Sequence, residues 1–104
     1  MDAILRALAD RTRRHILALV WRRERTAGQI AVEFAVSRPA ISQHLKVLLT
    51  SELLTVRRAG TRRLYQANRQ ALARLRAQLS AFWDDSLRKL KFAAEVAEHK
   101  RRRN

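Results

Sequence analysis

The stretch Ser37-Arg38-Pro39-Ala40-Ile41-Ser42-Gln43-His44-Leu45-Lys46-Val47-Leu48-Leu49 decides the fold of this 104-residue chain. Ser37 is a typical helix N-cap, and Pro39 suits the first helical turn, where a missing N–H costs nothing. Helical periodicity of about 3.6 residues per turn brings Ile41, Leu45 and Leu48 onto one face, which we expect to be buried. The stretch therefore predicts an amphipathic helix whose polar face points away from the core.

The outward face of this helix carries side chains that suit the major groove of DNA. By the same periodicity the outward residues are Arg38, Pro39, Ser42, Gln43 and Lys46. Gln pairs with adenine through two hydrogen bonds, Arg pairs with guanine, Ser pairs with several bases, and Lys binds phosphate. His44, on the flank of the buried face, is predicted to make a structural hydrogen bond instead. We interpret the segment from Ser37 to Leu49 as a recognition helix.

Three helices are expected before the recognition helix. The first is short and carries Ile4, Leu5 and Leu8. It ends near Asp10, which can cap the second helix, and Thr26 with Gln29 has the spacing of a capping box ahead of the third. The turn Ala35-Val36-Ser37 is short enough to set the third and fourth helices at a steep angle, as in a helix-turn-helix.

A basic β-hairpin is predicted after Leu54. The strand-like stretches Thr55–Arg58 and Arg62–Gln66 flank the turn Ala59-Gly60-Thr61. Its four arginines are Arg57, Arg58, Arg62 and Arg63. Like charges on paired strands repel each other, and a DNA backbone or a narrow minor groove relieves that repulsion. We therefore expect a DNA-contacting wing; an ordinary solvated hairpin is the alternative.

A long last helix is predicted from Asn68 to about His99. Its apolar positions are spaced three and four apart, with Ser86 interrupting: Leu72, Leu75, Leu79, Phe82, Leu90, Ala93 and Ala97. A stripe of this length predicts packing against a second copy as in a coiled coil, and covering the chain's own core is the alternative. The predicted dimer contacts are Ile4, Leu5, Leu8, Leu75, Leu79, Phe82, Trp83 and Leu90.

The charge balance points to a polyanionic partner. The chain has 23 Lys and Arg against 9 Asp and Glu, which gives a net charge of +14. Such an excess repels itself in a compact fold unless nucleic acid or counterions screen it. An RNA partner is disfavoured because Tyr65 is the only aromatic residue in the predicted hairpin, which is few for base stacking.

Several function classes are disfavoured by what the sequence lacks. With no cysteine, the chain has no disulfide, thiolate metal site or cysteine nucleophile. Ser42 and His44 are two positions apart on a helix and point in different directions, which spoils a nucleophile–base pair, so no enzyme is predicted. An apolar run of about 18 residues is missing, and the start of the chain lacks the layout of a signal peptide. We expect a cytoplasmic, nucleoid-associated protein without a membrane partner.

The length predicts one DNA-binding and dimerisation domain over residues 1–99. Residues 100–104, Lys-Arg-Arg-Arg-Asn, form a basic run that we expect to be a disordered tail. A phosphate-binding arm is the alternative interpretation of this run.

Three stretches resemble the ArsR-type winged-helix repressors: Leu8-Ala9-Asp10-Arg11-Thr12-Arg13-Arg14-His15-Ile16-Leu17, the segment from Ser37 to Leu48, and Phe82-Trp83-Asp84. The resemblance spans about residues 3–98. It implies a mostly α winged helix-turn-helix with five helices and a β-hairpin wing. It also implies a homodimer built by the first and last helices, whose two recognition helices read a partly palindromic operator. The implied groove contacts are Arg38, Pro39, Ser42 and Gln43, and the implied wing is Arg57 to Arg63. Arg11 stands where such sequences often have proline.

Many proteins of this family sense metals, but this chain lacks the cysteine cluster of the arsenic and cadmium sensors. A second family site, on the last helix, would have to use Asp84, Asp85, Glu95, Glu98 and His99. One imidazole per subunit is little for zinc, which prefers several nitrogen or sulfur ligands. No metal and no other cofactor is predicted.

Together these features predict a sequence-specific, homodimeric transcriptional repressor, including repression of its own gene, that acts by occluding a promoter. One alternative is a regulator that a ligand or partner protein releases from DNA through the long last helix. A basic RNA-associated protein is a further alternative. The identity of any effector is left open.

Overall fold

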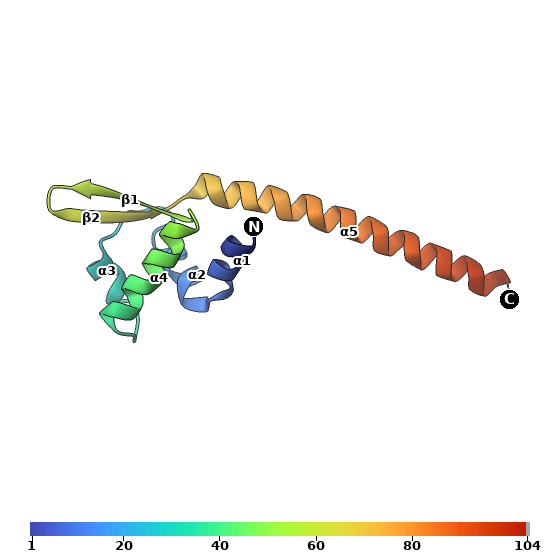
Figure 1. The fold of residues 1–104 in the computed structure, drawn as a ribbon, viewed down its shortest axis with the longest axis horizontal. Coiled ribbons are helices and arrows are strands. Elements are labelled where there is room, and N and C mark those ends of the chain that lie inside the picture. The colour runs from blue at the N-terminus through green and yellow to red at the C-terminus, as the bar shows by residue number, and fades with distance from the viewer. Residues whose placement is uncertain (104) are drawn as a thin grey trace. The chain divides into compact units, whose positions relative to one another are not determined.

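Five helices and one β-hairpin make up residues 1–103, the part of the chain that the computed structural model describes (Figure 1). The helices are α1 (Asp2–Ala9), α2 (Arg11–Leu19), α3 (Ala27–Ala31), α4 (Arg38–Thr50) and α5 (Arg69–Arg103), and the strands are β1 (Leu54–Ala59) and β2 (Arg62–Ala67). The predicted mostly helical class with five helices and a hairpin is confirmed. These residues fall into two compact units, Met1–Leu72 and the remainder of α5 from Ala73.

The helix starts follow the predicted capping signals. Asp10 Oδ1 accepts a hydrogen bond from the Arg13 backbone N–H at 3.0 Å, and Ser37 Oγ accepts one from Ala40 at 3.2 Å. Thr26 and Gln29 form the complete capping box, each side chain bonded to the other residue's backbone N–H. These bonds satisfy N–H groups that have no partner inside a helix, so each start is fixed by its local sequence.

The core of the first unit is apolar and is built from α2, α3, α4 and the residues that follow α4. Its largest fully buried side chains are Ile16, Val20, Ile30, Ile41, Leu48 and Leu53. Ile41 and Leu48 are 0% exposed and Leu45 is 2% exposed, which confirms the predicted buried face of α4. Burying each such side chain stabilises the fold by about 1.5–3 kcal/mol.

Two arginines of α2 form hydrogen bonds to backbone carbonyls at the end of α1. Arg13 Nε donates to the carbonyl oxygen of Ala7 at 2.7 Å, and Arg14 Nη1 donates to that of Leu8 at 2.7 Å. The last carbonyls of a helix lack partners within it and lie at the negative end of its dipole. The two guanidinium groups therefore cap the C-terminal end of α1.

A left-handed residue ends α4. Glu52 has φ 64°, its N–H donates to Leu49 O at 3.0 Å, and Leu53 N–H donates to Leu48 O at 3.0 Å. This pair of bonds is the Schellman motif, which usually has glycine at the left-handed position. Asn68 then donates from Nδ2 to Glu52 O at 3.0 Å, which ties the residue before α5 to the end of α4.

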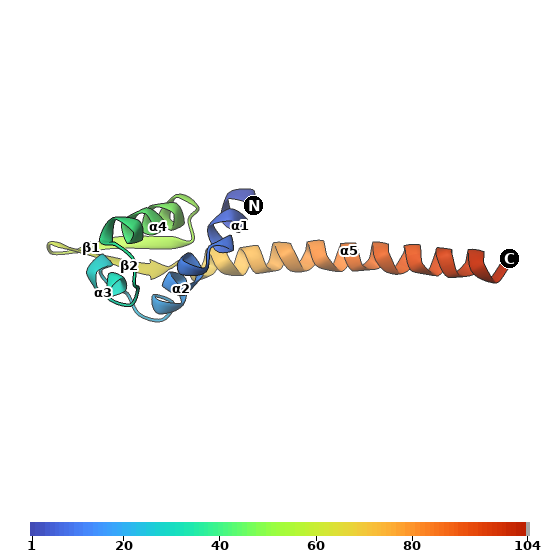
Figure 2. The ribbon, with the colours of Figure 1, turned by 90° about the horizontal axis from the view of Figure 1, so that it is seen from below.

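The hairpin is short and tightly turned. Ala59 pairs with Arg62, so Gly60 and Thr61 form a two-residue connection in which Gly60 has φ 65°. Arg25 bonds to the other edge of β2, with its N–H 3.0 Å from Tyr65 O and its carbonyl oxygen 2.8 Å from Tyr65 N. The tip of the hairpin projects past α3 and α4 (Figures 1 and 2).

Helix α5 is longer than its predicted extent. It continues past His99 through Lys100 to Arg103, whereas Asn104 of the predicted tail lies outside the described residues. Within it Lys89 pairs with Asp85 at 3.2 Å, and Arg102 pairs with Glu98 at 3.0 Å, each four residues apart. No helix of the described residues has the length and apolar character needed to cross a membrane. The division into a 1–99 domain and a separate tail stays a prediction.

Candidate nucleic-acid interface

All five residues predicted on the outward face of α4 are exposed: Arg38, Pro39, Ser42, Gln43 and Lys46. The reason is the register of the helix, because the buried residues Ile41, Leu45 and Leu48 occupy the opposite side. Ser37 and Pro39 fix the N-terminal turn and hence this register. The residues that could reach base edges therefore lie together on one side of one helix.

Two hollows flank this face. One, of about 320 Å³, lies between α4 and the hairpin, and its lining includes Ser42, Lys46 and Arg63. The other, of about 430 Å³, lies between α1 and α4, and its lining includes Arg6, Gln43 and Lys46. Lys46 lines both hollows and so stands on the ridge between them. Ser42 borders the hairpin side and Gln43 borders the α1 side.

Arg6 is a cation beside the reading face that the sequence pattern did not single out. It lines the same hollow as Gln43, and its side chain is exposed. Along the sequence it lies within the apolar pattern of α1, which predicts only a packing helix. No local signal could have identified it, because only the packing of α1 beside α4 brings it to this surface.

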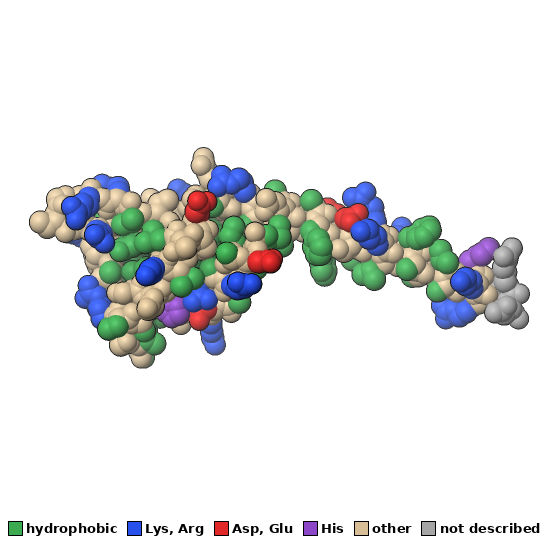
Figure 3. Space-filling view, in the orientation of Figure 1, with side chains coloured by type: hydrophobic (Ala, Val, Ile, Leu, Met, Phe, Trp, Pro, Cys, Tyr) green, Lys and Arg blue, Asp and Glu red, His purple; other side chains and the backbone are tan. Residues whose placement is uncertain are grey.

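The arginines at the hairpin tip lie close to one another. Arg58 is directly opposite Arg63 in the strand register, so their side chains share a face, and Arg62 is opposite Ala59. Within the described residues none of Arg58, Arg62 and Arg63 forms an ion pair. Figure 3 shows basic side chains at several places on the hairpin. Their mutual repulsion would be relieved by an anionic surface.

Arg57 differs from the other wing arginines because it has a carboxylate partner. Its Nε donates to Glu24 Oε2 at 2.6 Å, and its Nη2 donates to Glu24 Oε1. The hydrogen bond from Arg57 lowers the pKa of Glu24, and the same bond raises the pKa of Arg57. The sequence did not predict this pair, since Glu24 and Arg57 are 33 residues apart. It links β1 of the wing to the connection between α2 and α3.

His44 connects the recognition helix to the start of α2, which confirms its predicted structural role. Its Nδ1 lies 3.3 Å from Arg13 Nη1 and 4.0 Å from Asp10 Oδ1. The backbone N–H of Arg13 lowers the pKa of Asp10, helped by the charges of His44 and Arg13 against the opposing effect of burial. Arg13 therefore joins three elements: α1 through Ala7, its own helix through Asp10, and α4 through His44.

The predicted dimer residues differ in exposure within one chain. In α1, Ile4 and Leu8 are partly buried against the core, and Leu5 is 38% exposed. In α5, Leu75 is buried and Leu79 is half-buried, whereas Phe82, Trp83 and Leu90 are 63%, 62% and 66% exposed. Hydrophobic side chains stand out along α5 in Figure 3.

The predicted dimer contacts omitted three large exposed apolar residues of α5: Leu87 at 47%, Phe92 at 69% and Val96 at 40%. Leu87 follows Trp83 by four residues, so the helical spacing could have identified it.

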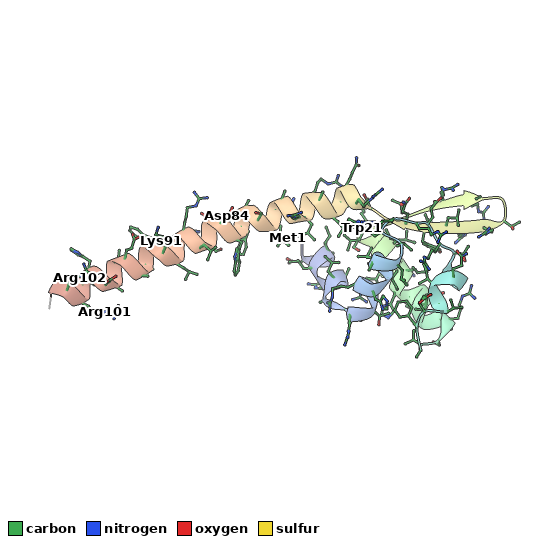
Figure 4. The ribbon with its side chains drawn as sticks, turned by 180° about the vertical axis from the view of Figure 1, so that it is seen from behind. Met1, Trp21, Asp84, Lys91, Arg101 and Arg102 are labelled. Carbon is green, nitrogen blue, oxygen red and sulfur yellow. The ribbon has the colours of Figure 1, made fainter. Side chains whose placement is uncertain are left out.

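No group of three or more His, Asp or Glu residues that could hold a metal ion occurs in the part of the chain that the structure describes. Two of the acidic residues of α5 form ion pairs with basic residues, in the Lys89–Asp85 and Arg102–Glu98 pairs. Figure 4 shows charged side chains such as Asp84, Lys91, Arg101 and Arg102 distributed along the helix.

Comparison with known proteins gives related sequences over most of the chain. Residues 10–56 match the family described as bacterial regulatory protein, arsR family. The HTH-type transcriptional regulator Rv2034 of Mycobacterium tuberculosis is 48% identical over 83% of this chain and 80% of its own length. The transcriptional repressor SdpR of Bacillus subtilis is 39% identical over 69% of this chain and 80% of its own length.

Solved structures agree with this relationship. An ArsR-like transcriptional regulator from Rhodococcus has a TM-score of 0.71 at 32% identity, covering 86% of this chain and 88% of its own. The homodimeric winged helix-turn-helix DNA-binding domain of Mb0332 from Mycobacterium bovis has a TM-score of 0.64 at 31% identity, covering 83% of this chain and 80% of its own. The helix-turn-helix of α3 and α4 with its adjoining β-hairpin is therefore a winged DNA-binding module. The chain belongs to the ArsR family of bacterial regulatory proteins, which are DNA-binding transcriptional regulators and not enzymes.

Proposed function

We propose that the protein is a homodimeric transcriptional repressor that reads a partly palindromic operator and occludes the promoter beneath it, including that of its own gene. Each protomer places α4 in the major groove, and two such helices meet successive grooves roughly 34 Å apart. The name of its relative SdpR, a transcriptional repressor, supports repression rather than activation.

The observation that carries this proposal is the surface formed by α4 with its two neighbouring hollows. Gln43 borders one hollow, Ser42 borders the other, and Lys46 lines both. Arg63 brings the wing to the same surface. No Asp or Glu among the described residues lines either hollow. This surface has hydrogen-bond donors on α4, cations on both sides of them and no carboxylate. Such a surface suits DNA, because the edges of the bases in a groove offer acceptors between two phosphate backbones.

The side chains divide into base readers and phosphate binders. Arg38, Ser42 and Gln43 have the hydrogen-bonding groups that distinguish base edges, and Pro39 packs at the N-terminal turn beside them. Lys46 and the wing arginines Arg58, Arg62 and Arg63 bind backbone phosphates, which adds affinity without sequence preference. Arg57, already held by Glu24, contributes less.

The exposed apolar side chains of the second unit support dimerisation. Phe82, Trp83 and Leu90 are exposed in the single chain, and exposing large apolar side chains along one helix is costly unless another surface covers them. One recognition helix also covers too few base pairs for a selective operator. The homodimeric domain of Mb0332 supports a second copy as the covering surface.

A titration on DNA tests the regulator proposal directly. Purified protein is added to a duplex from upstream of its own gene and to a scrambled duplex of the same composition, at several salt concentrations. We expect tighter binding to the upstream duplex at every salt concentration, with affinity for both duplexes falling as salt rises. Equal affinity for the two duplexes across the series would contradict sequence-specific regulation of its own gene.

The oligomeric state is tested separately from DNA binding. Sedimentation equilibrium should give twice the chain mass for the natural protein and the chain mass for a Phe82→Ser, Leu90→Ser double variant. A monomeric natural protein would contradict the dimer. A stable complex with a different protein would support the alternative, a partner-responsive regulator.

The wing offers a matched pair of variants. Arg62→Ala should weaken binding to operator and scrambled DNA alike and reduce the salt slope by about one, because one phosphate contact is lost. Arg57→Ala removes the same charge from a side chain that Glu24 already holds, so we expect a smaller change in slope. The measurement is the logarithm of the association constant against the logarithm of salt concentration. Equal slopes for the two variants would show that Arg57 also contacts phosphate.

A further inference from the structure

A hollow of about 610 Å³ lies in the first unit, among α1, α2, the connection after α2 and the start of α5. Its large apolar lining residues are Leu8, Leu17, Leu19, Trp21 and Leu72, and its charged lining residues are Arg14, Arg22, Arg23 and Arg25. None of these residues lines the two hollows beside α4. The DNA-reading surface therefore does not account for this arrangement.

The charges around this hollow are unbalanced. No Asp or Glu of residues 1–103 lines it, and none of its four arginines forms an ion pair within that range. Glu24 lies between Arg23 and Arg25 in the sequence, but both its oxygens accept hydrogen bonds from Arg57. The wing thus engages the carboxylate nearest in sequence. Arg23 and Arg25 also line a neighbouring hollow that includes Glu24 and Glu33, whereas Arg14 and Arg22 share no hollow with a carboxylate among the described residues.

One of these arginines has an unmet hydrogen-bonding need. Arg25 Nε is buried and has no hydrogen-bond partner among the described residues. The backbone of Arg25 makes two hydrogen bonds to that of Tyr65. A buried N–H of a charged group without an acceptor is costly, and the residues around Arg25 leave this N–H unsatisfied.

We infer that this hollow binds a hydrophobic carboxylate of the medium-chain fatty acid class. The hydrocarbon would lie on Leu17, Leu19 and Leu72, and the carboxylate would accept hydrogen bonds from the arginines. Guanidinium groups bind carboxylates through paired N–H···O bonds, and the volume is within the range of about 300–1,000 Å³ typical of small-molecule sites. The inference goes beyond the proposed regulator function, which needs no ligand.

Tryptophan fluorescence can report on this site. Trp21 lines the hollow (Figure 4), and the chain has two tryptophans, so a Trp83→Phe background leaves Trp21 as the sole reporter. The probes are decanoate, decanol and decyltrimethylammonium, which share a chain length and differ in head group. We expect a saturable fluorescence change with decanoate and affinity weaker by about tenfold or more for the other two, since hydrogen bonds to charged groups are the strong ones.

Two double variants in the same background separate local from overall charge. Arg22→Ala with Arg23→Ala should weaken decanoate binding by about tenfold and leave decanol binding unchanged. Arg101→Ala with Arg102→Ala removes the same charge from α5 and should change neither. Circular dichroism checks that each variant is folded, and Arg22→Gln alone replaces any double variant that is not.

Three results would overturn the inference. Equal affinity for the three probes would mean that the hollow binds hydrocarbon without recognising a carboxylate. An equal loss of decanoate affinity in both double variants would mean that only the overall positive charge of the protein attracts decanoate. No fluorescence change from nanomolar to high micromolar protein would mean that the hollow is closed in solution, by the fold or by a second copy. The titration contains no DNA, so its outcome is independent of the proposed repression.

Discussion

The two units of this chain use their apolar residues in opposite ways. In Met1–Leu72 the leucine and isoleucine side chains other than Leu5 are buried or half-buried, and Ile16, Ile30 and Leu48 are 0% exposed. From Ala73 onward α5 is a single helix in which Phe82 and Leu90 are 63% and 66% exposed. The first unit therefore contains its own source of stability, whereas the apolar stripe of the second needs another surface. This difference predicts that equivalent substitutions in the two units change different measured quantities.

The largest difference is expected from removing a leucine in each unit. Leu48→Ala should lower the free energy of unfolding by about 2–5 kcal/mol, because it leaves a cavity in a closed core. Leu90→Ala, at a concentration where the chain is monomeric, should change it by less than about 0.5 kcal/mol, as expected for an exposed position. Urea unfolding measures both. A comparable loss from Leu90→Ala would mean that the stripe is part of the monomer's stability.

Glutamine substitutions sharpen the comparison on the side of DNA binding. Gln43→Ala should cost about 1–3 kcal/mol on the preferred operator and leave binding to scrambled DNA nearly unchanged, since it removes a base contact. Gln78→Ala, at an exposed position of α5, is the control and should change neither. Fluorescence anisotropy with both duplexes measures the effect. If Gln43→Ala weakens binding to both duplexes equally, α4 does not read bases through this residue.

The cap at Asp10 gives a smaller effect with a defined pH dependence. Its pKa is lowered in the folded protein, so its contribution to stability is present above the unfolded value of about 4 and is lost as pH falls through the folded value. Asp10→Ala should cost about 1 kcal/mol at neutral pH through the lost cap. Asp10→Asn keeps a good cap but should flatten the acid side of the stability curve. Thermal unfolding from pH 3 to pH 7 measures both variants. If stability falls at acid pH as steeply in Asp10→Asn as in the natural protein, ionisation of Asp10 does not contribute to the pH dependence.

The smallest expected effect comes from replacing glutamate with glycine once in each unit. We expect the substitution to stabilise the first unit and to destabilise the second. Glu52→Gly should stabilise the protein by a few tenths to about 1 kcal/mol, because glycine adopts the left-handed conformation of Glu52 without steric cost. Glu95→Gly, inside α5, should lower helix content, since glycine disfavours a helix interior by about 1 kcal/mol relative to alanine. Thermal unfolding and circular dichroism measure the pair. Destabilisation by both would mean that side-chain contacts of Glu52 outweigh its backbone strain.

Local signals were enough to predict the elements and the outward face of α4. The caps at Asp10, Thr26 and Ser37 act within a few residues of their own positions, and the inward side of α4 follows from helical periodicity. These features depend on nearest neighbours along the chain, which a single sequence displays directly.

The contacts that were not predicted join residues far apart in sequence. Arg57 bonds to Glu24, Arg25 pairs with Tyr65, and Arg6 comes beside Gln43. A chain with 23 Lys and Arg offers many equivalent partners for each of its 9 carboxylates, so charge pattern alone cannot select a pair. The length of α5 was underestimated for a different reason: the basic run after His99 favours disorder by composition, yet arginine and lysine are good helix formers.

The alternation along α4 also bears on how such regulators diverge. Ile41 and Leu45, which are buried in the core, alternate with Ser42 and Gln43, which are exposed. Under the proposed reading of DNA by α4, a gene duplicate can exchange the outward residues with little loss of stability and acquire a new operator in few steps. Because buried and exposed residues alternate along α4, natural selection can change the exposed residues while the buried residues keep the fold.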